Sequence, residues 1–452
     1  MLGDVGLTIT YDISGCLADV VGENGLTPTE YDKWFERATK GAKQLKIAYE
    51  AELLPLLRIA ERREDIDILT EKFYTLIDGD DEVAEADTVV FLGTGGSSLG
   101  GQTIAQMGGW FIPGDDVNQP RKLPRTRIFD NLDPRSLERG IGLLDLKKAR
   151  FIIISKSGNT AETLLQTITV INAYKEAGLE AYIGRSILGL SEPPVPGGKN
   201  GLRDLLGLYN CEFLDHETDI GGRFSCLTNV GLIFAVARGM DPFQLREGAA
   251  KIINHLVYAD SYDDFMPVLG STVCVGLYQE RHVNNFVMMP YVNQLARFAN
   301  WYVQLWAESL GKDGVGMTPI AALGPVDQHS QLQLYMDGPI DKLVTIVATE
   351  TTGKGPFIDR ELAGVAGMDF FSDRHVGDLV SAQARATRSA LEEANRPTRY
   401  IRVSEVNEFT LGQLLMSFMV ETILAAGLLN INAFDQPAVE VGKRMARDFL
   451  RN

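Results

Sequence analysis

Two short segments place small and hydroxyl-bearing residues where an apolar run ends and a helical pattern begins. The first is Gly93 to Gly100, GTGGSSLG, and the second is Ser155 to Thr163, SKSGNTAET. Glycines let backbone N–H groups approach an anion closely, and the start of a helix adds partial positive charge. Hydroxyls around a lysine at a strand end, as in the second segment, can satisfy phosphate oxygens without a large basic patch. Together the two turns favour a phosphate-bearing ligand.

Each turn also has an alternative interpretation. The first two glycines fit the start of a dinucleotide-binding fingerprint, but Ser98 stands at its third glycine position. Asp130, which could bind a ribose, lies about twice as far on as the roughly 20 residues that this fingerprint expects. A plain strand-to-helix turn fits the first segment as well. In the second segment, Asn159 and Glu162 predict a capping box, which would explain part of the pattern.

Two charged side chains stand in positions that favour chemistry. Arg223 follows a pair of glycines that would let the backbone approach a ligand, although an exposed loop arginine fits the same sequence. Glu308 ends a predicted helix just before Gly311, a residue suited to the position after a helix. A carboxylate in the last helical turn opposes the helix macrodipole, so stability alone is a poor reason for it. The structural alternative is an ion pair with Lys312 at i+4.

A histidine and the closing segment supply further candidates. No two of the five histidines have the HxxxH or HExxH spacing of a zinc site, so no metal centre is predicted. His329 taken alone fits a surface histidine at the start of a helix. Gln436 and Lys443 are seven residues apart, and a helix starting near Pro437 would place both on one face. Ordinary amphipathic packing also explains that spacing.

The composition excludes several classes of protein. The chain has 452 residues, 45% of them hydrophobic, and 43 Lys and Arg against 60 Asp and Glu give a net charge of -17. Binding to nucleic acid or to an anionic membrane needs clustered positive charge, which this sequence lacks. An anionic ligand would therefore be captured by local groups such as Lys156, Arg223 and Lys443.

Neither export nor a disulfide framework is predicted. The four cysteines are scattered and form no CxxC pair, which favours reduced thiols and a cytoplasmic protein. Asp4 stands where a signal peptide would carry basic residues. The most apolar long stretch, 411–431, is interrupted by Gln413, Ser417 and Glu421, so we expect a buried helix there and not a membrane span.

The elements that must position these side chains form two α/β units of similar texture. Residues 30–78 have apolar positions at helical spacing and predict an N-terminal helical lead-in. From residue 88, and again from 285, short apolar runs without alternation predict buried parallel strands with crossover helices. Strands are expected at 88–93, 126–131, 151–155, 180–184, 285–290, 342–350 and 399–405, helices at 97–107, 134–144, 159–177, 291–307, 374–395 and 408–428, and a Pro- and Gly-rich loop at 191–204. An active site is expected in the cleft between the units.

Several motifs together resemble those of sugar isomerase (SIS) domains and, more narrowly, of the glucose-6-phosphate isomerase (phosphoglucose isomerase) family of the compact bacterial type. The family motifs are matched by the glycine turn at 93–100, the S-K-T/S-x-x-T-x-E-T loop at 155–163, G-G-R-[FY]-S at 221–225, Q-x-x-M-E-S at 304–309, Q-H at 328–329 and I-N-x-F-D-Q-x-G-V-E-x-G-K at 431–443. The sequence departs from the family at Ala307, at Pro437-Ala438 and around His329, but it keeps every proposed catalytic side chain.

This resemblance covers residues 88–445 and implies a fold. The expected architecture is two three-layer α/β/α sandwich domains of SIS type with mainly parallel sheets. We expect a helical lead-in at 1–80, a first SIS-type domain at 81–245 and a second, with a C-terminal helix, at 246–452.

The same resemblance implies reversible isomerisation of D-glucose 6-phosphate and D-fructose 6-phosphate through a cis-enediol, with no cofactor and no metal. Glu308 would move the proton between C2 and C1, Arg223 would stabilise the enediolate, and His329 and Lys443 would assist ring opening. In the family the histidine reaches the site from the neighbouring subunit, which implies a homodimer. The implied substrate-binding residues are Gly95, Gly96, Ser97, Ser155, Lys156, Ser157, Thr160, Gly222 and Gln436.

Two other functions are weighed against this one. A catalytically silent SIS-type sugar-phosphate sensor would share both turns, but it would have no reason to keep Glu308, Arg223 and Lys443 together. A transcriptional sensor would also carry a basic helix-turn-helix segment, and none is found. An NAD(P) enzyme is disfavoured by Ser98 and by the position of Asp130.

Overall fold

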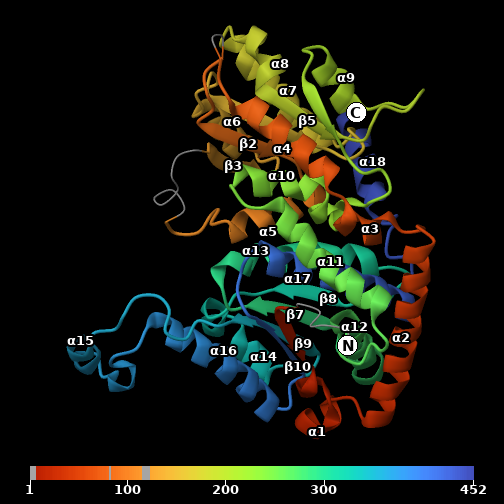
Figure 1. Ribbon diagram of the computed structural model, residues 1–452, viewed down its shortest axis with the longest axis vertical. Coiled ribbons are helices and arrows are strands. Elements are labelled where there is room, and N and C mark those ends of the chain that lie inside the picture. Colours follow the sequence, from red (N-terminus) through yellow and green to blue (C-terminus); the bar gives the residue numbers. More distant parts are fainter. Residues whose placement is uncertain (1–6, 81–82, 115–122, 452) are drawn as a thin grey trace.

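The computed structural model describes residues 7–80, 83–114 and 123–451, and these residues build two five-stranded sheets (Figure 1). One sheet lies in the upper half of Figure 1 and the other in the lower half, with helices such as α11 and α17 between them. Nearly all strand pairs are parallel. The α/β fold with mainly parallel sheets is therefore confirmed.

The first sheet is entirely parallel and has the order β3-β2-β4-β5-β6. Every residue of β2, β4 and β5 is buried, as expected for a sheet with helices on both faces. The strands are β2 (Thr88–Leu92), β3 (Arg125–Phe129), β4 (Ala149–Ile154), β5 (Ile187–Ser191) and β6 (Glu212–Asp215). Because parallel strands end at one edge, the glycine turn after β2 and the hydroxyl turn after β4 lie side by side.

Helices join these strands largely as predicted. They are α5 (Leu99–Met107), α6 (Pro134–Gly142), α7 (Ala161–Glu176), α8 (Ile183–Ser186), α9 (Gly201–Gly207) and α10 (Asn229–Ala237).

One prediction for this part of the chain is wrong, and another is correct except at its C-terminal end. Residues 180–184 are helical, and the strand is β5, whose ILGLS run is buried throughout and pairs with β4. Short apolar runs fit a strand or a buried helical turn equally, so periodicity could not separate them. The expected loop at 191–204 ends at Asn200, whose side chain caps α9 by accepting from the Arg203 amide.

The second sheet has the order β1-β10-β9-β7-β8. Its strands are β1 (Ile9–Asp12), β7 (Asn285–Pro290), β8 (Thr318–Ala321), β9 (Lys342–Thr349) and β10 (Thr398–Val403). β1 was not predicted and adds an antiparallel edge strand, with Ile9 opposite Val403. The N-terminal lead-in thus begins with a strand of the second sheet. Asp4, on which the export prediction relied, lies outside the described residues.

The remaining helices lie around the two sheets and between them. They are α1 (Ala18–Val21), α2 (Pro28–Glu50), α3 (Pro55–Arg58), α4 (Glu64–Ile77), α11 (Pro242–Tyr258), α12 (Met266–Arg281), α13 (Ala296–Leu310), α14 (Leu332–Asp337), α15 (Arg360–Val365), α16 (Val376–Glu393), α17 (Glu408–Leu429) and α18 (Val439–Arg451). The segment that carries α15 projects from the body of the molecule (Figure 1).

α17 is the central helix of the fold. Within the described residues it is the one helix long and apolar enough to span a membrane, but 94% of the relevant window is buried by the protein itself. Its polar residues are also enclosed: Glu421 forms an ion pair of 2.6 Å with Arg399 of β10, and both side chains are fully buried. α17 is therefore a core helix, as its interrupted apolar pattern predicts.

Candidate active site

Arg223 is the centre of a polar cluster where elements of the two sheets meet. It lies in the 3-10 helix Gly222–Leu227 beyond β6, and its side chain is only 3% exposed. A guanidinium has five N–H donors, and here each has an acceptor. Nε donates to Ser309 Oγ (2.9 Å), Nη1 to Glu308 Oε2 (3.2 Å) and Gln436 Oε1 (2.8 Å), and Nη2 to the carbonyls of Ala433 (2.6 Å) and Asp435 (3.0 Å). The alternative of an exposed loop arginine is wrong.

Burial lowers the pKa of Arg223, and the Coulombic attraction of Glu308 opposes that shift. Arginine stays protonated in proteins even so, because its ordinary pKa lies far above neutral pH. The cluster therefore holds a fixed positive charge beside a carboxylate.

Glu308 lies in the last turn of α13, as predicted, and faces the cluster. Its Oε2 accepts from Arg223 and its Oε1 accepts from Gln304 Nε2 at 3.1 Å, one helical turn earlier. The side chain is 35% exposed, so small molecules can reach it. Lys312 forms its ion pair with Asp435 at 2.7 Å, which removes the i+4 pairing as an explanation of Glu308.

The glycine turn packs directly on the arginine segment. A Cβ on Gly96 would lie 2.3 Å from the carbonyl carbon of Gly222, so the two backbones touch. Gly95 has a φ of +57°, and a Cβ there would lie 3.2 Å from Gln304 Nε2. Ser97, half-buried, completes the same turn. The turn after β2 is thereby brought next to Arg223 and Glu308.

The second turn, which we call the phosphate loop (residues 155–160), lies at the neighbouring strand end. Ser155 is buried and donates from Oγ to Thr160 Oγ1 at 3.1 Å, while Ser157 is exposed. The predicted capping box is absent from this turn, because Thr160 is the N-cap residue and Asn159 bonds the Lys199 carbonyl and the Gly201 amide. The hydroxyls are therefore not needed to cap α7.

Lys156, predicted to be a substrate-binding cation, has its ammonium directed elsewhere. Nζ donates to the carbonyls of Thr218 (2.7 Å) and Ile220 (3.2 Å). These carbonyls belong to residues 216–222, which we call the arginine loop because they lead into Arg223. In this conformation the side chain of Lys156 links two loops.

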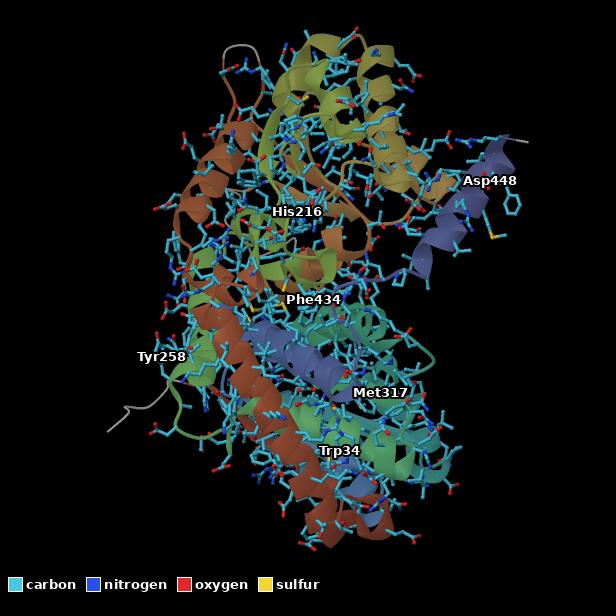
Figure 2. The ribbon with its side chains drawn as sticks, turned by 90° about the vertical axis from the view of Figure 1, so that its right-hand side faces the viewer. Trp34, His216, Tyr258, Met317, Phe434 and Asp448 are labelled. Atoms are coloured by element: carbon cyan, nitrogen blue, oxygen red, sulfur yellow. The ribbon has the colours of Figure 1, made fainter. Side chains whose placement is uncertain are left out.

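The closing segment is divided by the start of α18. Gln436 joins the Arg223 cluster, and its neighbour Phe434, labelled between the two halves of the molecule in Figure 2, packs on Phe224 with ring centroids 5.4 Å apart. Lys443 lies beyond the start of α18 at Val439, is exposed and pairs with Glu440 at 2.7 Å. The expectation that Gln436 and Lys443 share a helix face is wrong, since the helix begins after Gln436.

α18 itself projects from the body, with the labelled Asp448 near its tip (Figure 2). All of its described residues are exposed, including Phe449 and Leu450. Lys443 is consequently held apart from Glu308 in this chain.

His329 is likewise not part of the cluster. It lies in the 3-10 helix Val326–His329 after β8, is exposed, and no described residue hydrogen-bonds to its ring. The adjacent Gln328 is anchored on α16, where its amide reaches Thr387 and the Gln383 carbonyl. The single chain therefore assembles Arg223, Glu308, Gln436 and the two turns, but neither His329 nor Lys443.

Two functional residues were not singled out by sequence reasoning. Gln304 and Ser309 orient Glu308 and Arg223 respectively. The signal was available, since both belong to the motif that contains Glu308 and Gln304 lies four residues before it, which is one helical turn.

The structure also weakens the dinucleotide alternative. Asp130 Oδ2 accepts from Gln102 Nε2 at 2.7 Å, and the same nitrogen donates to Ser98 Oγ at 2.8 Å. This gives the carboxylate of Asp130 and the hydroxyl of Ser98 a structural role behind the glycine turn. No group of three or more His, Cys, Asp or Glu that could hold a metal ion occurs in the described part of the chain.

Two mainly parallel α/β sheets, with a glycine turn and a hydroxyl turn beside an arginine–glutamate pair, have the arrangement expected of a phosphosugar isomerase. The family model for phosphoglucose isomerase matches residues 61–321 and 378–452. The chain belongs to the phosphoglucose isomerase family. His329 and α15 lie between the two matched ranges.

Individual relatives agree with this assignment. The chain is 36% identical to a glucose-6-phosphate isomerase of Rubrobacter xylanophilus over 80% of this chain and 84% of the relative. It is 32% identical to a probable glucose-6-phosphate isomerase of Methanococcus maripaludis over 85% and 83% of the two chains. A hypothetical protein of Thermus thermophilus superposes with a TM-score of 0.81 at 27% identity, covering 98% of this chain and all of the other. A glucose-6-phosphate isomerase of Chlamydia trachomatis shares the fold, with a TM-score of 0.70 at 22% identity over 86% and 73% of the two chains.

Proposed function

We propose that this chain catalyses the reversible isomerisation of D-glucose 6-phosphate and D-fructose 6-phosphate through a cis-enediol intermediate. The observation that carries the proposal is the contact of 3.2 Å between Arg223 and Glu308 beside two phosphate-type turns. A base must remove a proton from the carbon next to the carbonyl, and a cation must stabilise the oxyanion that forms. The cluster supplies both groups at one place.

The substrate phosphate binds at the edge where β2 and β4 end. Gly95, Gly96 and Ser97 offer backbone amides, and the phosphate loop offers the hydroxyls of Ser155, Ser157 and Thr160 together with its own amides. Gly222 lets the sugar approach the backbone beside Arg223. Few cations are needed, because hydroxyls and helix-start amides can satisfy a single small dianion.

Proton transfer is assigned to Glu308. Its carboxylate takes the proton from C2 of the open-chain aldose and returns it to C1. The hydroxyl proton moves from O2 to O1, so the C2 hydroxyl becomes the ketone and the C1 aldehyde becomes an alcohol. Gln304 and Arg223 hold the two carboxylate oxygens, which fixes the base for both transfers. Both hydrogens of Arg223 Nη1 are bonded, to Glu308 and to Gln436. The guanidinium would therefore stabilise the enediolate through its charge and through an N–H that exchanges Gln436 for a substrate oxygen. The electron pair stays within the sugar, so no cofactor and no metal is required.

Ring opening is assigned to His329 and Lys443. Since neither contacts Glu308 within one chain, we propose a homodimer in which His329 reaches the site of the neighbouring subunit. Lys443 would join its own site when α18, which is fully exposed, moves against the body. We further propose a cytoplasmic location, with neither nucleic acid nor membrane as a partner.

Replacing Glu308 by Gln tests the proposal. Without the base, formation of glucose 6-phosphate from fructose 6-phosphate should fall about 10²–10⁴-fold, while binding of fructose 6-phosphate survives. Turnover is measured in a coupled assay and binding by calorimetry. Glu393→Gln is the matched control and should leave turnover unchanged, because Glu393 is also a carboxylate in the last turn of a helix, α16, but is exposed.

The wild-type chain must also form product in deuterated water. Deuterium at C2 of glucose 6-phosphate demonstrates proton exchange at the enediol, and product without deuterium is consistent with internal transfer by Glu308. A wild-type chain that binds fructose 6-phosphate without forming glucose 6-phosphate would be the silent sensor, and near-normal activity of Glu308→Gln would remove Glu308 as the base.

A further inference from the structure

The phosphate loop and the arginine loop are joined by one charged side chain. Lys156 Nζ lies 2.7 Å from the Thr218 carbonyl oxygen and 3.2 Å from that of Ile220. No other donor reaches either carbonyl in the described residues. Lys156 is therefore the single hydrogen-bonded link that we find between this stretch of the arginine loop and the phosphate loop.

The backbone of Lys156 is held in place by hydrogen bonds. The Lys156 carbonyl accepts from Ser191 Oγ at 3.1 Å and from the Glu192 amide at 2.9 Å, both at the end of β5. The arginine loop begins at the same strand end, where the His216 amide donates to the Ser191 carbonyl at 2.9 Å. Lys156 thus starts from fixed backbone and reaches across to the far part of the loop.

Most of the ammonium is occupied before a substrate binds. It carries three N–H donors, of which two bond the carbonyls, and Glu192 Oε1 forms an ion pair with Nζ at 3.6 Å, which is beyond hydrogen-bond distance. To bind a phosphate oxygen, Lys156 would have to use its third N–H against the attraction of Glu192 or release a carbonyl. Among the described residues, the hydroxyls and amides of the phosphate loop form no hydrogen bond with the arginine loop.

The link affects the path of the backbone that leads into Arg223. Ile220 is buried, but the next two residues are Gly221 and Gly222, which have no side chain to fix the backbone. Gly222 is positioned by contact with Gly96 on one side and by the carbonyls held at Lys156 on the other. A shift of the loop would move the backbone that carries Arg223 and so weaken the contact of the guanidinium with Glu308, although Ser309 and two carbonyls also hold that group. Displacement of about 1 Å at a reacting centre can cost about 10²-fold in rate.

We propose that Lys156 is a positioning residue, whose ammonium couples the phosphate loop to the arginine loop and so sets the place of Arg223. This inference rests on the proposed function of the same site, but it reassigns Lys156 from direct binding of the phosphate. Substrate phosphate held by the loop then stabilises the arrangement in which Arg223 meets the enediolate, which is how binding energy remote from the reacting carbons is used in catalysis.

The test is a comparison of Lys156→Met, Lys156→Arg and Lys199→Met. Lys156→Met keeps the length of the side chain and removes its donors, so kcat with fructose 6-phosphate should fall about 10- to 100-fold. KM for fructose 6-phosphate and Ki for inorganic phosphate should change by less than about threefold, since the phosphate ligands remain. Lys156→Arg, which can still donate to two carbonyls, should recover most of kcat.

Lys199→Met is the matched control. Lys199 is exposed, its side chain has no hydrogen-bond partner among the described residues, and its carbonyl accepts from Asn159 of the phosphate loop. The variant removes a positive charge beside the same loop without touching the arginine loop, and it should leave kcat and KM unchanged.

A second measurement does not depend on activity. Hydrogen–deuterium exchange of peptides spanning residues 216–224 should be faster in Lys156→Met than in the wild type and unchanged in Lys199→Met. Lys156→Leu, which also lacks a donor, replaces Lys156→Met if that variant does not fold. A wild-type chain without turnover contradicts the proposed function, while this exchange experiment still tests the link.

The proposal is overturned by any of four results. The first is a rise of about tenfold in the phosphate Ki of Lys156→Met with kcat retained, which would mark Lys156 as a direct ligand. The second is unchanged kinetics in Lys156→Met, and the third is an equal loss of kcat in Lys199→Met. The fourth is failure of Lys156→Arg to recover kcat in a folded protein.

Discussion

At the scale of single residues, Arg223 combines two kinds of partner. Ser309 and the two main-chain carbonyls of 433 and 435 hold Nε and Nη2 inside the protein, where no substrate can replace them. Nη1 instead bonds Glu308 and Gln436, which are at least partly exposed. One end of the guanidinium is therefore fixed, and the other presents its positive charge to the site.

Gly96→Ala should damage catalysis through the backbone. A methyl group at this position would lie 2.3 Å from the Gly222 carbonyl carbon, so the glycine turn or the arginine segment must shift. We expect kcat/KM for fructose 6-phosphate to fall about 10²-fold, because the shift separates the turn from Arg223. Gly142→Ala in α6 is the control, since a Cβ there meets nothing within 4 Å. Wild-type kinetics in Gly96→Ala would contradict the close contact.

At the scale of elements, the arginine loop depends on a buried histidine as well as on Lys156. His216, labelled in Figure 2, is 3% exposed, and its Nδ1 lies 2.8 Å from the Glu217 carbonyl, which makes this nitrogen the donor. Burial, with a smaller contribution from the charge of Lys156, lowers the pKa of His216 from 6.5 to about 4. The ring is thus neutral in the native loop at neutral pH.

This shift predicts acid sensitivity with a definite sign. Between pH 6.5 and about 4 the unfolded chain binds a proton at His216 that the native chain does not, so the free energy of unfolding falls as the pH is lowered. Across this range the loss approaches about 3 kcal/mol, at about 1.4 kcal/mol per pKa unit. Urea unfolding of wild type and His216→Asn at several pH values measures it. The wild type should lose more stability than the variant below pH 6.5, and parallel curves would exclude His216 as the cause.

Several elements were predictable because their signal is local. The runs TVVFL and FIII are apolar throughout and end at Gly or Ser, which is enough to place β2 and β4 and the two turns that follow them. The position of Glu308 in the last turn of α13 follows from helical spacing and Gly311.

Other features depend on distant parts of the chain, so no local pattern indicates them. Asn159 was expected to cap α7, but residues 199 and 201 approach it and take its side chain. Lys156 was expected at the phosphate, but its partners lie about sixty residues on, in a loop whose path is set by the sheet. β1 is short and half-exposed, and only its pairing with β10 identifies it as a strand.

At the scale of the whole molecule, one chain builds an incomplete set of the proposed catalytic groups. Arg223, Glu308 and Gln436 meet between the sheets, whereas His329 is exposed beyond β8 and α18 leaves its apolar residues uncovered (Figure 2). The net charge of the chain is -17, and the positive charge of Arg223 is paired with the carboxylate of Glu308. A second subunit that contributes His329 would complete the site and cover exposed surface.

Mixed dimers distinguish a histidine that crosses the interface from one that acts in its own chain. In a dimer of one Glu308→Gln subunit and one His329→Gln subunit, a crossing histidine leaves one site with both substitutions and the other with neither. The two subunits of such a dimer are related by symmetry, so it has two equivalent sites. Random assembly makes about half of the dimers mixed, and one of the two sites in each mixed dimer carries neither substitution. A 1:1 co-refolded sample should therefore regain about a quarter of wild-type turnover. If His329 serves its own chain, each site of the mixed dimer carries one substitution, and activity stays at the mean of the two parent variants. Affinity tags of two kinds confirm that mixed dimers are present, so an absence of recovery in purified mixed dimers rules out the crossing arrangement.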